Sequence, residues 1–229
     1  MENLEEISRK IEAQLNEKDR LRETTLKTCR DIIRLSRKSI RSVHNGEAEQ
    51  AAEMAAEAVQ LTTELKEQIG DHPDLLTAGY MENASQELAE AHMLLAIEQD
   101  QPFPAPEDIG VTYTSYLLGL GDVVGELRRK AVILLKEGKI AEVEDVLNLM
   151  EDITDQLMEF DYPSGLVPVK RKQDVAKKLL EQMRGDFVIF KKNKEFEEKI
   201  DLVLKHLRKK ETATEEKEDF GLDVDSVWR

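Results

Sequence analysis

Two short acidic pairs are the residues of this chain most able to do chemistry. Glu87 and Glu90 stand three positions apart, and Asp122 and Glu126 stand four positions apart. On a helix, either spacing places both carboxylates of a pair on one face. Two acidic pairs on facing helices would repel unless a cation such as a divalent metal ion lay between them. The pattern leaves two alternatives, a metal-dependent catalytic site or four acids on ordinary solvated helix faces.

The surroundings of these acids favour a shared ion. The nearby residues are small, namely Ala84, Ser85, Ala89 and Ala91 around the first pair and Gly119, Gly121 and Gly125 around the second. Small residues let helix backbones approach closely, as facing carboxylates must in order to share an ion. His92 has the wrong offset from Glu90 for the Glu-x-x-His motif of a di-iron bundle. An all-oxygen ligand set favours Mg²⁺ or Mn²⁺, which activate water for phosphodiester hydrolysis.

A row of basic residues is the second candidate surface. It consists of Arg30, Arg34, Arg37, Lys38 and Arg41, which fall on one side of a predicted helix beside an apolar face. Few acids interrupt the row, and arginine suits bidentate contact with phosphate. The alternative is a solvated helix face that happens to be basic. Cations for a phosphate backbone and carboxylates for a metal ion together indicate a nuclease.

The net charge of −15 would by itself argue against a nucleic-acid partner, since phosphate binding depends on lysine and arginine. The charges are segregated, however. Residues 22–44 carry a net charge of +5 and residues 168–210 a net charge of +7, whereas residues 45–167 carry −20. Such a chain can present one basic surface to a polyanion while another surface stays acidic.

The elements that must position these residues are all helical. Apolar residues recur at helical spacing, and the six prolines fall in a few loops. The predicted helices cover residues 2–44, 47–69, 75–99, 109–138, 140–159 and 170–209. We predict a single all-α domain over residues 1–210, an antiparallel bundle of about six or seven long helices, and an acidic C-terminal tail over residues 211–229.

Other features restrict where the protein acts and which chemistry it uses. No apolar run is long enough for a bilayer, and the acidic start of the chain does not match a secretory signal. The single cysteine, Cys29, is expected to be a small core residue in a reducing, cytoplasmic compartment. The chain has no phosphate-binding loop, dinucleotide fingerprint or Gly-x-Ser-x-Gly motif, and histidines 44, 72, 92 and 206 form no recognisable nucleophile arrangement.

Four segments of the chain resemble the translin family, most closely its catalytic branch, translin-associated factor X, in an archaeal-like form. They are the basic helix around residues 29–41, Gln-Glu-Leu-Ala-Glu-Ala at 86–91, Leu-Gly-Leu-Gly-Asp-Val-Val-Gly-Glu-Leu-Arg at 118–128, and the loop and helix from residue 161. The resemblance implies an all-α subunit in a hollow, roughly octameric shell that encloses nucleic acid. It also implies a Mg²⁺-dependent endoribonuclease whose catalytic acids fall on Glu87, Glu90, Asp122 and Glu126.

The sequence therefore predicts a homo-oligomeric endoribonuclease that uses Mg²⁺ or Mn²⁺, with the four acids as metal ligands and the basic row as the phosphate contact. Its ligand would be single-stranded or duplex RNA, with single-stranded DNA as a further candidate. Two alternatives remain open. One is a translin-like shell that binds RNA or single-stranded DNA without cutting it, and the other is a helical scaffold for protein partners.

Overall fold

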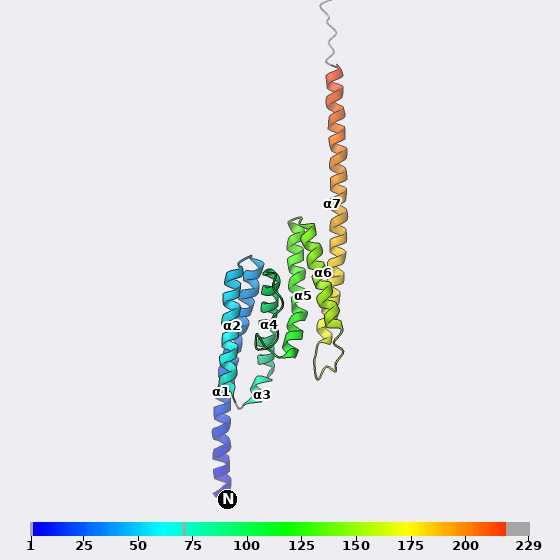
Figure 1. The fold of residues 1–229 in the computed structure, drawn as a ribbon. Coiled ribbons are helices and arrows are strands. Elements are labelled where there is room, and N and C mark those ends of the chain that lie inside the picture. The colour runs from blue at the N-terminus through cyan, green and yellow to red at the C-terminus, as the bar shows by residue number, and fades with distance from the viewer. Residues whose placement is uncertain (1, 71, 219–229) are drawn as a thin grey trace, which may run out of the picture. The chain divides into compact units, whose positions relative to one another are not determined.

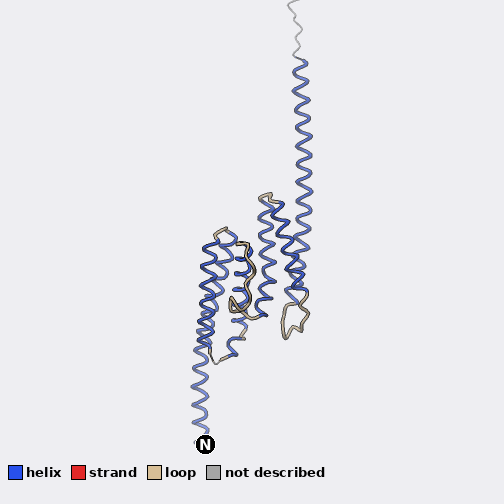
Figure 2. The backbone as a smooth tube through the Cα atoms, viewed as in Figure 1, coloured by secondary structure: helices blue, strands red, loops and turns tan. Residues whose placement is uncertain are grey.

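The computed structural model describes residues 2–70 and 72–218, and every regular element in these residues is a helix (Figures 1 and 2). The helices are α1 (Glu2–His44), α2 (Ala48–Ile69), α3 (Pro73–Leu76), α4 (Gly79–Glu98), α5 (Tyr113–Lys136), α6 (Ile140–Met158) and α7 (Lys170–Glu218). The prediction of an all-α bundle is therefore confirmed.

Most helix ends agree with the sequence because strong local signals set them. Gly46 and Gly138 follow α1 and α5 with φ values of +75° and +73°, a left-handed conformation that glycine adopts without steric cost. Thr112 caps the start of α5, where its hydroxyl accepts a hydrogen bond from the Ser115 amide at 3.1 Å. Three helices differ from expectation, since the short α3 is separate from α4, α5 begins at Tyr113 rather than at residue 109, and α7 continues to residue 218. The predicted tail is thus helical over 211–218, and residues 219–229 lie outside the described residues.

The chain divides into two compact units, Met1–Met183 and Arg184–Arg229, with the division inside α7. In the first unit, α1 and α2 form an antiparallel hairpin, and α5 and α6 form another. Small buried residues line the first hairpin, and the Ser39 hydroxyl of α1 donates to the Ala51 carbonyl of α2 at 2.8 Å. Cys29 is buried in the core of this unit, as predicted, and burial raises the pKa of its thiol to about 11.

Helices α4 and α5 run in the same direction, which the prediction of an antiparallel bundle did not include. Ser115 near the start of α5 contacts Glu82 near the start of α4, and Lys130 near the end of α5 pairs with Glu98 at the end of α4 at 2.8 Å. The connection of residues 99–112 makes this possible, because it returns along the unit before α5 begins (Figure 2). Lys66 of α2 secures its far end by donating to the Gly110 carbonyl at 2.6 Å.

Helix α1 also runs parallel to α4. Cys29 lies 3.7 Å from Met81, sulfur to sulfur, and further along both helices Arg37 reaches Glu87. Helix α4 therefore contacts α1 on one side and α5 on the other. This arrangement brings the basic row and both acidic pairs to one region of the first unit.

The described part of the second unit is the remainder of α7, and its described side chains include an exposed apolar series, among them Phe196, Ile200, Val203 and Leu207. None of the helices in the described residues is both long enough and apolar enough to cross a membrane.

Candidate functional site

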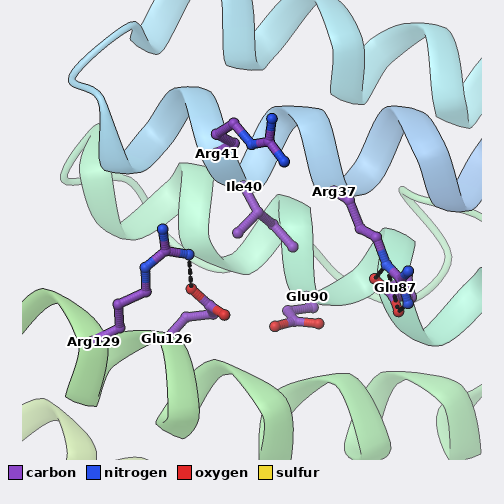
Figure 3. A pocket seen from close by; sticks show the side chains of 7 residues that line it. All are labelled: Arg37, Ile40, Arg41, Glu87, Glu90, Glu126 and Arg129. Atoms are coloured by element: carbon purple, nitrogen blue, oxygen red, sulfur yellow. Dashed lines mark hydrogen bonds and ion pairs between the residues drawn. The ribbon is translucent and has the colours of Figure 1, made fainter.

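A pocket of about 370 Å³ lies where α1, α4 and α5 meet. Its lining, which we call the acid–arginine pocket, consists of Arg37, Ile40 and Arg41 from α1, Glu87 and Glu90 from α4, and Glu126 and Arg129 from α5 (Figure 3). Three of the four acids predicted to act together and two of the predicted basic residues thus line one pocket. Figure 3 shows Glu90 between Glu126 and the ion pair of Arg37 with Glu87.

The close approach of α4 and α5 depends on Gly119. A Cβ atom at this position would lie 2.8 Å from the Gln86 carbonyl oxygen and 3.1 Å from the Glu90 backbone nitrogen. Both distances are too short for a carbon atom, so no residue larger than glycine fits without a backbone shift. The small residues around the acids therefore let the two helices approach closely, as the sequence predicts.

Glu90 is the most deeply buried acid of the site. Its side chain has no hydrogen-bond partner within the described residues, and the residue is only 9% exposed. Burial, followed by the charges of Asp122, Glu87 and Glu126, raises the pKa of Glu90 to about 8. The other three predicted acids thus all lie close enough to act on Glu90, and Glu90 is largely protonated at neutral pH.

The other three acids each have a basic partner. Arg37 donates to both oxygens of Glu87, at 2.6 Å to Oε1 and 3.0 Å to Oε2. Lys172, in the first turn of α7, pairs with Asp122 Oδ1, while the Gln86 amide donates to Asp122 Oδ2. These contacts neutralise much of the negative charge that the cluster would otherwise concentrate.

Glu126 has two basic neighbours. His44, the last residue of α1, lies 2.5 Å from it, Nε2 to Oε2, and its side chain is only 6% exposed. Arg129 lies one turn along α5, 3.4 Å from the same oxygen. The hydrogen bond from His44, together with the electrostatic effect of His44 and Arg129, holds the pKa of Glu126 below its usual value.

The carboxylates fit Mg²⁺ or Mn²⁺ in kind but are not gathered around a single point. Across residues 2–70 and 72–218, no three His, Cys, Asp or Glu side chains are placed so that they could hold a metal ion as they stand. The reason lies in the contacts above, since Glu87, Asp122 and Glu126 turn toward their own basic partners. An ion would need these oxygens to exchange one cation for another, with Glu90 losing its proton.

The predicted basic row divides into two parts. Arg37 and Arg41 line the acid–arginine pocket, whereas Arg30, Arg34 and Lys38 are exposed on α1 outside its lining. Arg34 pairs with Asp31 of its own helix at 2.9 Å. The basic row therefore lies partly in the lining of the pocket and partly on the exposed surface of α1 outside it.

Four residues of the site were not among the predicted ones: His44, Gln86, Arg129 and Lys172. A signal for His44 was present, because positions 30, 34, 37, 41 and 44 form one helical stripe and histidine continues its basic character. Lys172 gave no such signal, since its approach depends on how the start of α7 packs against α5.

Comparisons with known proteins place this geometry in context. The profile described as the translin family matches residues 72–214. An uncharacterised protein of Methanocaldococcus jannaschii is 33% identical over 180 residues, which cover 78% of this chain and 80% of that protein.

Among solved structures, the crystal structure of AfC3PO is similar with a TM-score of 0.73 and 34% identity, over 80% of this chain and 96% of that one. The structure of AfC3PO in complex with duplex RNA gives a TM-score of 0.70 and 33% identity, over 80% and 95% of the two chains. Apo-NeC3PO has a TM-score of 0.72 over 79% and 95%, but at 19% identity it supports the fold alone.

Proposed function

This chain belongs to the translin family, and from that premise we propose that it is a metal-dependent endoribonuclease that binds RNA at the acid–arginine pocket. The observation that carries the proposal is the meeting of three carboxylates and three arginines in one pocket at the junction of three helices. A relative at 33% identity has been solved in complex with duplex RNA, which supports RNA as the ligand.

The proposed metal ligands are Glu87, Glu90, Asp122 and Glu126, and the proposed ion is Mg²⁺ or Mn²⁺. When bound, such an ion activates water and stabilises the charge that develops at phosphorus. The other residues position these groups and the substrate. Gln86 holds one oxygen of Asp122, His44 orients Glu126, and Arg41 and Arg129 offer cations to the phosphate backbone. The placement of Glu87, Glu90 and Glu126 in one pocket, with Asp122 close enough to act on Glu90, supports the catalytic branch of the family, that of translin-associated factor X.

The proposed working form is a closed homo-oligomer, with eight subunits if the family pattern holds. A subunit of net charge −15 binds a polyanion best when its acidic surfaces face away from the ligand, and a closed shell achieves this. Exposed apolar residues on the first half of α1, namely Leu4, Ile7, Ile11 and Leu15, support contacts between subunits. Light scattering should report a single large species, whereas a fully active monomer at micromolar concentration would remove the shell from the proposal.

A second candidate function is RNA or single-stranded DNA binding without cleavage. The observation in its favour is that Glu87, Asp122 and Glu126 already have basic partners, which balance their charges without a metal ion. The two functions differ in what a divalent ion does, because only the nuclease requires one.

The deciding experiment incubates the purified protein with labelled RNA and DNA, with Mg²⁺ or with EDTA. We expect cleavage of RNA in Mg²⁺ alone, and its loss in Asp122→Asn and Glu126→Gln with RNA affinity retained or improved. Asp155→Asn, an exposed acid of α6, is the matched control and should cleave normally. Cleavage that persists in EDTA or in both site variants would refute the proposed metal-dependent chemistry. RNA binding without cleavage, in Mg²⁺ as well as in EDTA, would support the second candidate.

A further inference from the structure

Lys172 is built into the site more firmly than an ordinary surface lysine. A Cβ atom at Gly121 would lie 2.7 Å from Lys172 Cβ and 3.2 Å from its Cγ, so the stem of the lysine occupies space that only glycine leaves open. The Lys172 amide also donates to the Val169 carbonyl at 2.8 Å, which fixes the backbone at the start of α7. The position of the ammonium group is therefore set by packing as well as by charge.

The ammonium group of Lys172 is directed at the acids. It pairs with Asp122 Oδ1, and its positive charge also opposes the rise in the pKa of Glu90. Because Gln86 donates to the other oxygen of Asp122, both oxygens of this carboxylate are engaged by the protein. The Lys172 side chain is 24% exposed, so the pair is partly shielded from solvent and from salt.

A divalent ion held by the four acids would compete with the ammonium group of Lys172 for the carboxylate of Asp122. Two cations on one carboxylate repel each other strongly in a partly buried site. Resting on the proposed function, we propose that Lys172 is a built-in competitor of the divalent ion, and that ion binding releases its ammonium group from Asp122 to a phosphate of the RNA. Since the stem stays packed at Gly121, the released group remains beside the site and replaces one carboxylate partner with one phosphate partner.

This exchange couples the two ligands. The ion makes a cation available for RNA, and RNA gives the displaced ammonium group a new partner, so each ligand strengthens binding of the other. Arg37 cannot be assigned the same role on packing grounds, because its side chain is 66% exposed and free to leave Glu87 for solvent.

The test measures Mn²⁺ binding to the full-length protein without RNA, from the electron paramagnetic resonance signal of the free ion. Lys172→Met keeps a stem of similar length against Gly121 and removes the charge, so it should bind Mn²⁺ about tenfold more tightly than the wild type. Lys172→Arg, which keeps the charge, should bind it like the wild type. Lys170→Met is the matched control, since Lys170 is exposed in the same turn, and its affinity should be unchanged.

A second measurement tests the other half of the exchange. At saturating Mn²⁺, Lys172→Met should lose about tenfold in RNA affinity or in kcat although its site is fully loaded, and Lys172→Arg should recover most of the loss.

The outcomes separate this proposal from the function on which it rests. If neither the wild type nor Lys172→Met binds Mn²⁺, the metal site itself is refuted. The role of Lys172 as a competitor of the ion is then refuted as well. If the wild type binds Mn²⁺ and Lys172→Met binds it equally or more weakly, the metal site stands and Lys172 is only an interhelical ion pair.

Discussion

Two faces of helix α1 pack closely against other helices, and the two contacts have opposite effects on the free energy of the fold. Toward α2 the helix meets the small buried residues Ala51, Ala55 and Ala58, and the polar contacts there are neutral ones made by the hydroxyls of Ser39 and Ser42. Toward α4 and α5 it presents Arg37, Arg41 and His44 to a group of carboxylates. The first face lowers the free energy of the fold through burial, whereas the second brings charged groups into partial burial, which costs free energy.

The difference shows where the molecule accepts strain. In the hairpin, small residues fill the contact without gaps. In the pocket, Gly119 permits the close approach of α5 to α4, and burial, followed by the charges of the neighbouring acids, raises the pKa of Glu90 to about 8. Acids collected at such a cost are typical of functional sites, because selection for stability alone would disperse them. Stability and activity should therefore respond differently to mutations on the two faces.

The largest expected effect comes from separating α4 and α5. Gly119→Ala places a Cβ atom against the backbone of Gln86 and Glu90, so α5 must shift, and RNA cleavage should fall about 100-fold. Gly125→Ala is the matched control on the same helix, because its Cβ would meet only Leu179 Cδ1, at 3.8 Å. Cleavage assays and thermal unfolding of both variants check this.

The α1–α2 hairpin allows the opposite test, a substitution that lowers stability but leaves activity unchanged. Ala58→Leu should overpack the contact of α1 with α2 and lower the free energy of unfolding by about 1–3 kcal/mol, while cleavage per folded molecule stays normal. If Ala58→Leu lost activity as strongly as Gly119→Ala, the two faces would not be functionally distinct.

A smaller effect is expected for charge removal at the edge of the pocket. Arg41→Gln should weaken RNA binding about tenfold for every sequence and reduce the slope of log affinity against log salt by about 1. Arg30→Gln removes the same charge from the same helix outside the pocket lining, and its loss should be clearly smaller. Equal losses in a salt titration would mean that the whole row contacts RNA.

The last effect concerns stability as a function of pH. The pKa of Glu90 is raised from 4.5 to about 8, so its protonated form favours the fold and the stability it contributes is lost as pH rises across this range. The loss is at most ~1.4 kcal/mol per pH unit. In EDTA, Glu90→Gln should therefore gain stability over the wild type at pH 8.5 and little at pH 4.5.

Urea unfolding at the two pH values measures this difference. Glu57→Gln, which removes a carboxylate from the exposed side of α2, is the control. If the free energy of unfolding changed by the same amount between pH 4.5 and pH 8.5 in the wild type and in Glu90→Gln, Glu90 would not be held in its protonated form.

Sequence patterns predicted those parts of the fold and the site that depend on local signals. Periodicity and glycine stops gave the helices, and the spacing of the acids gave the face on which each pair lies. The small residues Gly119 and Gly121 indicated close contact between helices. Both make such a contact, Gly119 with α4 and Gly121 with Lys172 of α7. What the sequence could not predict is which cation meets which acid, because Lys172 is 50 positions from Asp122 and His44 is 82 positions from Glu126.

The parallel direction of α4 and α5 was missed for a related reason. Connections of a few residues usually join antiparallel neighbours, and the prolines of the 99–112 connection were read only as the end of a helix. The length of this connection allows it to return along the unit, and its contacts with α2 and α5, through Gly110 and Pro104, are long-range.

This return connection also sets an order of events during folding. The hairpins α1–α2 and α5–α6 close short loops and can form early, whereas the parallel contacts of α1, α4 and α5 require distant segments to meet and pay a larger entropy of loop closure. We therefore expect the acids of α4 and α5 to meet their cations only after these two hairpins have formed. A chain that has not completed its folding has no assembled pocket, so cleavage of RNA would be restricted to finished subunits.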